Sequence, residues 1–326
     1  MGYTRFGANA RASHVTLMEY LLYYAGFNRA SGLEQIGLAK SDDLVHWTRA
    51  SQLPVVVAGS CGGADAAQSS NPCVLREDER FRMWYQGKSK QGALSVCYAE
   101  SLDGVAWQVR PEAVLAPLAA GGYRYGYQQP HVLYDRGLGI FRMWCAKHEA
   151  NNAMIAYAES NDGISWVVRD ENVLAPVQPW EGIRVYYPFV EQRRDELEMW
   201  YTGRRIGQLW AIGRAMSRDG ISWQRDPANP QLPTRESSAR ERIVAQWKAL
   251  FSIRSEPVFG AASPFVFECE GKRRMLTHDV GGNQRLSIGM YEFDDGAWRS
   301  IARDILREGA NEWDSYFQAD PYLIVI

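Results

Sequence analysis

The chain has 326 residues, and its 36 Lys and Arg nearly balance its 38 Asp and Glu, for a net charge of −2. This balance provides no strong field for nucleic acid or for a membrane surface, so we expect neither as a partner. No stretch reaches the length of a transmembrane helix, and no apolar run follows a basic start as in a signal peptide. We therefore expect a cytoplasmic protein.

The cysteines are five in number and scattered, which favours neither a disulfide framework nor a metal site. They are Cys61, Cys73, Cys97, Cys145 and Cys269. An odd count without paired spacing is typical of a reducing compartment. No zinc motif, Gly-rich phosphate loop or nucleophile elbow appears. We expect no metal and no cofactor.

A short aromatic strand opens the chain and then recurs along it, each time followed by a second short strand. The first strand is predicted over 20–26, 81–87, 141–147, 197–203 and 273–278. The second is predicted over 35–40, 94–100, 154–159, 210–216 and 285–291. A fixed period of this length indicates a repeat architecture.

The motif Ser-x-Asp-Gly-x-x-Trp follows the second strand. Copies begin at Ser41 (without the glycine), Ser101, Ser160 and Ser217, and a degenerate copy covers 294–298. The Asp-Gly pair predicts a tight turn in which Gly supplies a positive φ. The Trp begins a predicted outer strand and could cap the contact between neighbouring repeats.

A third motif carries a proline and precedes each aromatic strand. The pairs are Asn71-Pro72, Gln129-Pro130, Tyr187-Pro188, Ser263-Pro264 and, at the far C-terminus, Asp320-Pro321. Trp313-Asp314 precedes the last proline by the same spacing at which Trp180-Glu181 precedes the third. The C-terminal segment therefore matches the innermost strand of the first repeat.

These patterns predict an all-β, five-bladed β-propeller in a single domain, 1–326, with four-stranded antiparallel blades. The N- and C-terminal strands close one blade. The expected blades are 14–50 with 313–326, then 64–110, 122–169, 180–226 and 256–300. Residues 13–15 can also be aligned with 130–132, and closure would then be arranged differently.

One insertion, at about 235–251, interrupts the repeat. Its apolar residues have helical spacing behind a serine that could cap the helix. The options are a linker helix on the rim, a lid over the channel mouth and an oligomer contact.

Candidate ligand-binding residues occupy two sets of loops that meet on one face of a propeller. The first set lies at and before the prolines: Asn71, Gln128, Gln129, Tyr187, Ser263 and Asp320. The second set follows the aromatic strand: Lys88, His148, Arg204, His278 and Asp279. The mainly cationic second set is either solvated loop charge or a basic rim for an anionic ligand. A ring of polar side chains around a channel suits a hydrophilic small molecule.

The three motifs cover nearly the whole chain and resemble those of the five-bladed propeller glycosidase superfamily. That superfamily includes arabinanases, levansucrases and invertases, in glycoside hydrolase families 43, 32 and 68, and the mannoside phosphorylases of family 130. The resemblance implies the fold and a carbohydrate site at the channel mouth. The motifs are specific for the fold and weak for the reaction.

Hydrolases of this superfamily use three carboxylates, and the resemblance finds only one of them here. It places the base or nucleophile at Asp320. The second position is Asn71 and the third, that of the acid, is Gln128. An amide cannot act as a general acid or base near neutral pH.

Three explanations remain open: the blades are misaligned, another acid substitutes, or the reaction is not the hydrolysis of the superfamily. The candidate substitutes are Glu149, Asp279, Glu256, Glu181 and Asp65. Since Asp65, Glu181 and Asp314 occupy nearly equivalent places, we expect them to be structural. His278 beside Asp279 could transfer protons at neutral pH, although neighbours on a strand point to opposite faces.

We expect a glycosidase-like enzyme that hydrolyses or phosphorolyses a glycoside or an anionic sugar derivative. Its partner would be a small-molecule carbohydrate, and Asp320, His278 and Asp279 are the catalytic candidates. A phosphorylase would need cationic groups beside Asp320, such as Lys88, His148 and Arg204. The alternative, supported by Asn71 and Gln128, is a non-hydrolytic propeller enzyme or a sugar-binding protein in metabolite biosynthesis.

Overall fold

The computed structural model describes residues 18–77, 79–116, 125–149, 151–204, 210–233, 258–281, 286–306 and 312–326. This part of the chain is all-β, as predicted, and its one helical element is the short 3-10 helix η1 (Glu312–Asp314). The predicted helix at 235–251 and the alternative inner strand at 13–15 lie outside the described residues.

The strands pair antiparallel in five groups of four. The first is β20 (Phe317–Val325), β1 (Tyr20–Asn28), β2 (Leu33–Ser41) and β3 (Thr48–Arg49). The second is β4 (Gln68–Glu77), β5 (Arg80–Lys88), β6 (Leu94–Ser101) and β7 (Gln108–Val109). The third is β8 (Gly126–Asp135), β9 (Ile140–Glu149), β10 (Asn152–Ser160) and β11 (Val167–Leu174). The fourth is β12 (Val185–Arg193), β13 (Glu196–Arg204), β14 (Trp210–Ser217) and β15 (Gln224–Arg225). The fifth is β16 (Val258–Cys269), β17 (Lys272–Gly281), β18 (Leu286–Asp294) and β19 (Ala297–Ala302).

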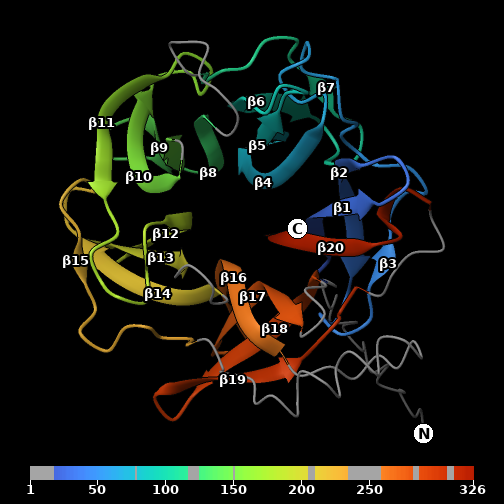
Figure 1. The fold of residues 1–326 in the computed structure, drawn as a ribbon. Helices are drawn as coiled ribbons and strands as arrows, with labels where there is room; N and C mark the ends of the chain where they lie inside the picture. Colours follow the sequence, from blue (N-terminus) through green and yellow to red (C-terminus); the bar gives the residue numbers. More distant parts are fainter. Residues whose placement is uncertain are drawn as a thin grey trace, which may run out of the picture.

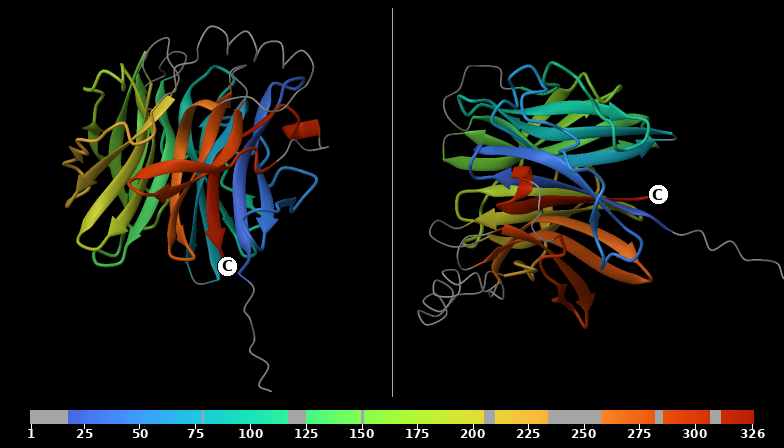
Figure 2. Two further views of the ribbon diagram at one scale, coloured as in Figure 1. Left: turned by 90° about the horizontal axis from the view of Figure 1, so that it is seen from below. Right: turned by 90° about the vertical axis from the view of Figure 1, so that its right-hand side faces the viewer.

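The five groups surround a common axis, with β4, β8, β12, β16 and β20 innermost (Figure 1). Seen from the side, the longer strands of neighbouring groups are inclined in a similar way, although strands within a group alternate in direction (Figure 2). Single parallel contacts, Glu34 to Gln68 and Leu94 to Gly126, join the first three groups. In the first group the C-terminal strand β20 pairs with β1, so residues distant in sequence form one sheet.

Each innermost strand contains a β-bulge at its proline. In β4, for example, Ser70 pairs with Gln86 and Cys73 with Trp84, so Asn71 and Pro72 together oppose one residue. The same register shift occurs in the other four groups. A bulge accommodates proline because the extra residue is left out of the hydrogen-bond ladder.

The residue before each of these prolines has a positive φ. The angles are 49° at Asn71, 54° at Gln129, 50° at Tyr187, 52° at Ser263 and 53° at Asp320. A residue before proline ordinarily prefers an extended backbone, and L-residues pay about 1–2 kcal/mol for the left-handed region. The cost is repeated five times around the axis, which marks these positions as places where side chains are held in a set direction.

The Ser-x-Asp-Gly-x-x-Trp motif forms the predicted turn and also joins neighbouring groups. The glycine carbonyl accepts a hydrogen bond from an aromatic side chain of the preceding group. The pairs are Tyr23–Gly104 at 2.7 Å, Trp84–Gly163 at 2.7 Å and Trp144–Gly220 at 2.8 Å. At Gly163, φ is 78° and a Cβ would lie 2.9 Å from Trp84, so turn shape and close approach both require glycine.

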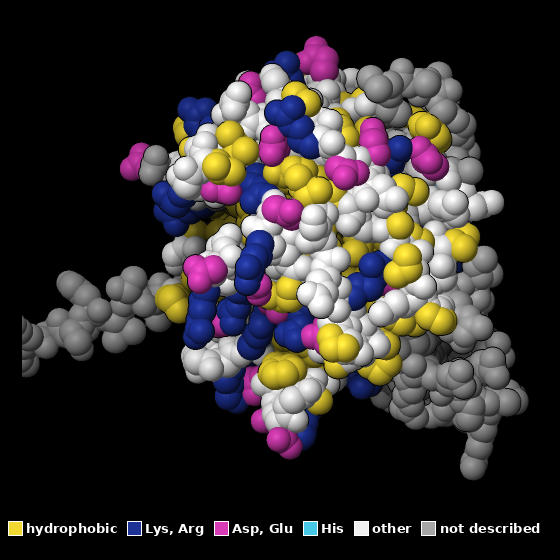
Figure 3. All heavy atoms as spheres, turned by 90° about the vertical axis from the view of Figure 1, so that its left-hand side faces the viewer, with side chains coloured by type: hydrophobic (Ala, Val, Ile, Leu, Met, Phe, Trp, Pro, Cys, Tyr) yellow, Lys and Arg dark blue, Asp and Glu magenta, His cyan; other side chains and the backbone are white. Residues whose placement is uncertain are grey.

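The outer surface in Figure 3 mixes Lys and Arg with Asp and Glu. All five cysteines are buried and none forms a disulfide. No helix in the described ranges is long and apolar enough to cross a membrane.

Candidate functional site

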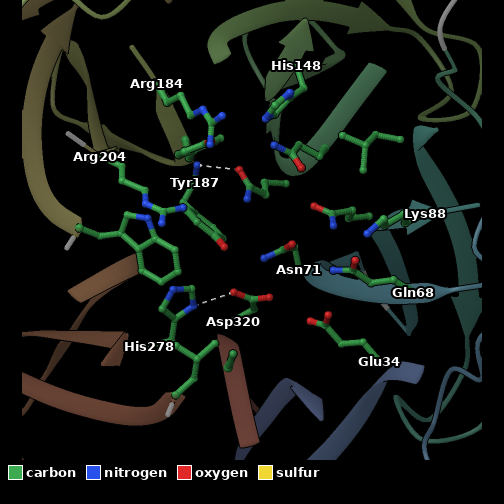
Figure 4. Close-up of a pocket in the computed structure, with 18 of the residues that line it drawn as sticks. Glu34, Gln68, Asn71, Lys88, His148, Arg184, Tyr187, Arg204, His278 and Asp320 are labelled. Carbon is green, nitrogen blue, oxygen red and sulfur yellow. Dashed lines mark hydrogen bonds and ion pairs between the residues drawn. The ribbon is translucent and has the colours of Figure 1, made fainter. Parts of the chain in front are cut away.

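A cavity of about 230 Å³ opens at the mouth of the axis, where the innermost strands begin (Figure 4). Nine of the predicted residues line it: Asn71, Lys88, Gln128, Gln129, His148, Tyr187, Arg204, His278 and Asp320. They come from all five groups, whereas Ser263, which was also predicted, lines the adjoining cavity on the axis. The repeat motifs therefore identify side chains that the fold brings to one place.

Asp320 is held in the cavity by a hydrogen bond with His278. The distance from His278 Nδ1 to Asp320 Oδ1 is 2.9 Å, and the two side chains are 1% and 6% exposed. When the Asp320 carboxylate accepts this bond the hydrogen is on Nδ1, and in the neutral imidazole Nε2 is then an acceptor. This Nε2 is buried and has no hydrogen-bond partner among the described residues. The His278 ring packs against Tyr187 and Trp210, with ring centroids 5.2 Å and 5.1 Å away.

Asp279, predicted as a catalytic residue, does not line the cavity. Its side chain lies on the opposite face of β17 from His278, because neighbours on a strand alternate. Its Oδ1 accepts hydrogen bonds from Thr277 (2.7 Å) and Tyr291 (3.0 Å). Burial raises the pKa of Asp279 to about 6. His278 forms its hydrogen bond with Asp320, and its strand neighbour Asp279 points to the other face, as the alternation of side chains on a strand allows.

Three other acids occupy structural positions behind the inner strands. Asp65 accepts from Tyr85 at 3.0 Å, Glu181 from Tyr201 at 2.8 Å and Asp314 from Tyr24 at 2.9 Å. All three are fully buried, and none lines the cavity. The strand position that Asp279 holds is taken in these groups by Gly87, Gly203 and Gly26, where a Cβ would clash with the acid-bearing segment. In the fifth group the buried carboxylate thus comes from Asp279, on the strand itself. In the first, second and fourth groups it comes from the segment that precedes the innermost strand.

Of the remaining proposed substitutes for the missing acid, Glu149 forms an ion pair with Lys147 at 2.7 Å and does not line the cavity. Glu256 lies outside the described residues.

Lysine, arginine and histidine side chains line the cavity on more than one side, with Arg184 and Arg204 across it from Lys88 (Figure 4). Lys88, His148 and Arg204 were predicted, and Arg184 joins them (Figure 4). The Arg204 guanidinium lies 5.3 Å from the Trp210 ring, and Arg184 Nε donates to the Asn151 carbonyl at 2.7 Å. Guanidinium and ammonium groups that converge on one cavity can bind phosphate or carboxylate oxygens.

Sequence reasoning missed Glu34, the second residue of β2, which lines the same cavity. Glu34 and Asp320 are the two carboxyls among the described lining residues. Burial, and next the negative charge of Asp320, raise the pKa of Glu34 to about 8, against the opposing effect of Lys88. Its position directly after the turn between the first two strands, which faces the channel mouth, is the feature of the sequence that could have identified Glu34.

Amide side chains complete the lining. Gln68 and Gln86 join Asn71, Gln128 and Gln129 in the cavity. The side-chain Oε1 of Gln129 accepts a hydrogen bond from the Tyr187 backbone N–H at 3.1 Å, which connects the third and fourth groups. The donors and acceptors of amides suit sugar hydroxyls, which are both donors and acceptors.

Chemically, the arrangement offers a carboxylate oriented by an imidazole, a second carboxyl, cationic groups and uncharged hydrogen-bonding groups. In the described part of the chain, no cluster of three or more His, Cys, Asp or Glu side chains could hold a metal ion.

Comparisons with known proteins agree with this fold. The chain is 30% identical over 200 residues to the uncharacterized protein Rv1502 of Mycobacterium tuberculosis. That match covers 58% of this chain and 64% of the relative, so less than two thirds of the relative is spanned.

Solved structures with the same fold include a thermostable family-43 glycoside hydrolase, with a TM-score of 0.64 and 18% identity over 90% of this chain and 92% of that one. An exo-1,5-α-L-arabinanase from a bovine ruminal metagenomic library gives a TM-score of 0.58 and 12% identity over 86% of this chain and 91% of that one.

The family model for glycoside hydrolase family 130, described as β-1,4-mannooligosaccharide phosphorylase, matches residues 126–318. This range includes the inner strands of three groups and the side chains of Gln128, Gln129, His148, Arg204 and His278. Since the match extends over more than half of its length, the chain belongs to glycoside hydrolase family 130.

Proposed function

We propose that this protein cleaves a glycosidic bond in the cavity, by hydrolysis or phosphorolysis, with Asp320 as base or nucleophile. The observation that carries the proposal is the buried Asp320–His278 pair, which faces a cavity lined by amides and cationic groups. A hydrogen bond from His278 Nδ1 orients the Asp320 carboxylate toward the cavity. Asp320 can then accept a proton from water or attack the anomeric carbon.

Phosphorolysis is the form of the reaction that the charges favour. Lys88, Arg184 and Arg204 would place positive charge where an attacking phosphate or the acidic group of a sugar derivative could bind. The description of the family as a phosphorylase of mannooligosaccharides supports the same reaction and suggests a mannoside as substrate.

We also propose that the five strand groups are the blades of one five-bladed propeller that comprises the whole chain. Pairing of β20 with β1 would close the ring by joining C-terminal and N-terminal strands in one blade. The repeated bulge and the repeated turn support a common blade plan.

Turnover of nitrophenyl glycosides, mannosides among them, tests the reaction in the wild-type protein and in Asp320→Asn, each with and without phosphate. We expect turnover in the wild-type protein, a requirement for phosphate, and loss of turnover in Asp320→Asn. Phosphate-independent turnover would assign hydrolysis instead. A fully active Asp320→Asn would rule out the role given to Asp320.

A second candidate function is binding or non-hydrolytic conversion of a sugar derivative. It is favoured by the amides of Asn71 and Gln128, which line the cavity where the superfamily places carboxylates. Absence of turnover on every glycoside, together with a rise in Tm on addition of a sugar or sugar phosphate, would select this function.

A further inference from the structure

Glu34 occupies a junction between the first two strand groups. It lies at the beginning of β2, pairs with Phe27 of β1, and meets Gln68 of β4 in the next group. Lys88 of β5 and Asp320 of β20 line the same cavity. Figure 4 shows the Glu34 and Asp320 side chains directed into one space from different strands.

The two carboxyls have different surroundings, and this difference decides which one carries the negative charge. Asp320 has the His278 Nδ1 at 2.9 Å, which stabilises a carboxylate. Among the hydrogen bonds and ion pairs of the described residues, none reaches the Glu34 carboxyl, although Lys88 acts on it at longer range. Two carboxyls that share one cavity do not both ionise easily, so the one without a hydrogen-bond donor keeps its proton.

The same conclusion follows from the electrostatics. Burial and the charge of Asp320 raise the pKa of Glu34 from 4.5 to about 8. Burial also raises the pKa of Tyr187 well above its ordinary value, with Asp320 and Glu34 adding to the effect. Near neutral pH the Glu34 carboxyl therefore keeps its proton.

We propose that Glu34 is the general acid of this site and replaces the acid whose expected position is held by Gln128. The inference rests on the glycoside cleavage proposed above. A carboxyl that is protonated at neutral pH can donate to a leaving group, which an amide cannot do. Pairs of carboxyls with separated pKa values are a general solution for acid and base roles in one site.

In the step itself, the bond between the anomeric carbon and the glycosidic oxygen breaks, and its electron pair stays on that oxygen. The oxygen takes the proton of Glu34, which becomes a carboxylate. The nucleophile is phosphate or water, which gives its proton to Asp320 as its oxygen forms the new bond to the anomeric carbon. Exchange of protons with solvent restores the protonated Glu34 and the ionised Asp320.

The experiment compares Glu34→Gln with the wild-type protein on aryl mannosides of graded leaving-group acidity and on methyl mannoside. A dinitrophenolate leaves without protonation, whereas methoxide needs an acid. We expect Glu34→Gln to lose on the order of 10²–10⁴-fold on methyl mannoside and less than about tenfold on the dinitrophenyl substrate. Activity of the wild-type protein should fall above about pH 8 as Glu34 ionises, and this alkaline limb should vanish in the variant.

Glu149→Gln is the matched control, because Glu149 is a nearby glutamate that lies outside the cavity. It should retain the rates and pH profile of the wild-type protein. If Glu34→Gln does not fold, Glu34→Asp keeps the carboxyl, and it should be slowed most on methyl mannoside while keeping an alkaline limb.

Equal losses of Glu34→Gln on all substrates, or an unchanged alkaline limb, would overturn the assignment of the acid and leave glycoside cleavage standing. If the wild-type protein turns over none of the mannosides or other nitrophenyl glycosides, the proposed function fails, and the acid role fails with it.

Discussion

In each of the five innermost strands, the residue before the proline and the residue after it have different surroundings. Directly before proline stand Asn71, Gln129, Tyr187, Ser263 and Asp320, all with left-handed backbones and all at the mouth or just inside the axis. Directly after it stand Cys73, His131, Phe189, Phe265 and Tyr322, all buried around the axis. Along each strand, the proline therefore separates a side chain at the mouth of the axis or just inside it from a side chain that packs the strands together.

The residues after proline behave as a core even where they are titratable. His131 Nε2 donates to the Val190 carbonyl at 2.7 Å, and its ring lies 4.7 Å from that of Phe189. Burial lowers its pKa to about 4. By contrast, Asp320 and His278 satisfy each other at the edge of a cavity. Polar residue types alone therefore do not mark the site, whereas their position relative to the bulge does.

The largest effect on function is expected at Asp320. Asp320→Asn keeps the shape of the side chain but removes the base, so turnover should fall by about 10²–10⁴-fold with little change in Tm. Steady-state rates on the substrate that the wild-type protein prefers give the measurement. Asp195→Asn, at an exposed turn, should have no effect. A similar loss of turnover in both variants would contradict the special place of Asp320.

On the other side of the proline, the largest effect should be on stability. Phe265 packs against Tyr322 and Phe189, with ring centroids 4.7 Å and 4.9 Å away. Phe265→Ala should lower the free energy of unfolding by about 3–5 kcal/mol, measured by urea denaturation, because it leaves a cavity at the axis. Phe265→Leu should cost clearly less. A loss below about 1 kcal/mol in Phe265→Ala would show that the axis is not a tightly packed core.

Asp279 is next to His278 in the sequence but points away from the cavity, and a substitution there tests whether it contributes to stability and not to turnover. Its folded-state pKa is raised from 3.8 to about 6. As the pH rises, unfolded chains therefore release this proton at a lower pH than the folded protein does. The free energy of unfolding should decrease by on the order of 3 kcal/mol as the pH rises from about 4 to about 6. In Asp279→Asn this part of the fall should disappear, as followed by Tm against pH. Turnover that depends on Asp279 as strongly as on Asp320 would assign it to the site.

The smallest predicted effect concerns Arg204, one of the cationic residues that line the cavity. Arg204→Met should raise the KM for phosphate, or for an anionic sugar, on the order of fivefold, since an exposed charge pair is worth about 1 kcal/mol. The kcat should change little. Lys147→Met, which removes a cation paired with Glu149 and Glu171, is the control. An unchanged KM in Arg204→Met would show that Arg204 is a solvated surface charge that does not bind the anion.

The repeats allow much of this molecule to be predicted. Strand positions follow from aromatic runs and turns, and the residues before proline reach one region because every group repeats the same bulge. Ser263 and Asp279 are the exceptions, the first because it points to the axis and the second because it faces the back of its strand. The left-handed backbone before proline was not predictable, since local preference opposes it.

Glu34 and Arg184 were missed for a different reason. Neither belongs to a repeated motif, and each reaches the cavity because neighbouring groups meet beside it: Glu34 contacts Gln68, and Arg184 contacts Ala153. Only the placement of one group against the next reveals such residues. Asp279 does follow a repeated strand, but its structural role becomes clear only by comparison with Asp65, Glu181 and Asp314 in the other groups.

The left-handed residue before each proline has a consequence for how such a protein can diversify. Prolines and buried neighbours fix the backbone there, whereas nothing in the strand pairing depends on which side chain stands at the bulge. Descendants could therefore change their ligand through exchanges at five positions while inheriting an intact scaffold. A library of variants restricted to these positions would remain mostly folded, and Asn, Asp and Gly should be enriched among its most stable members.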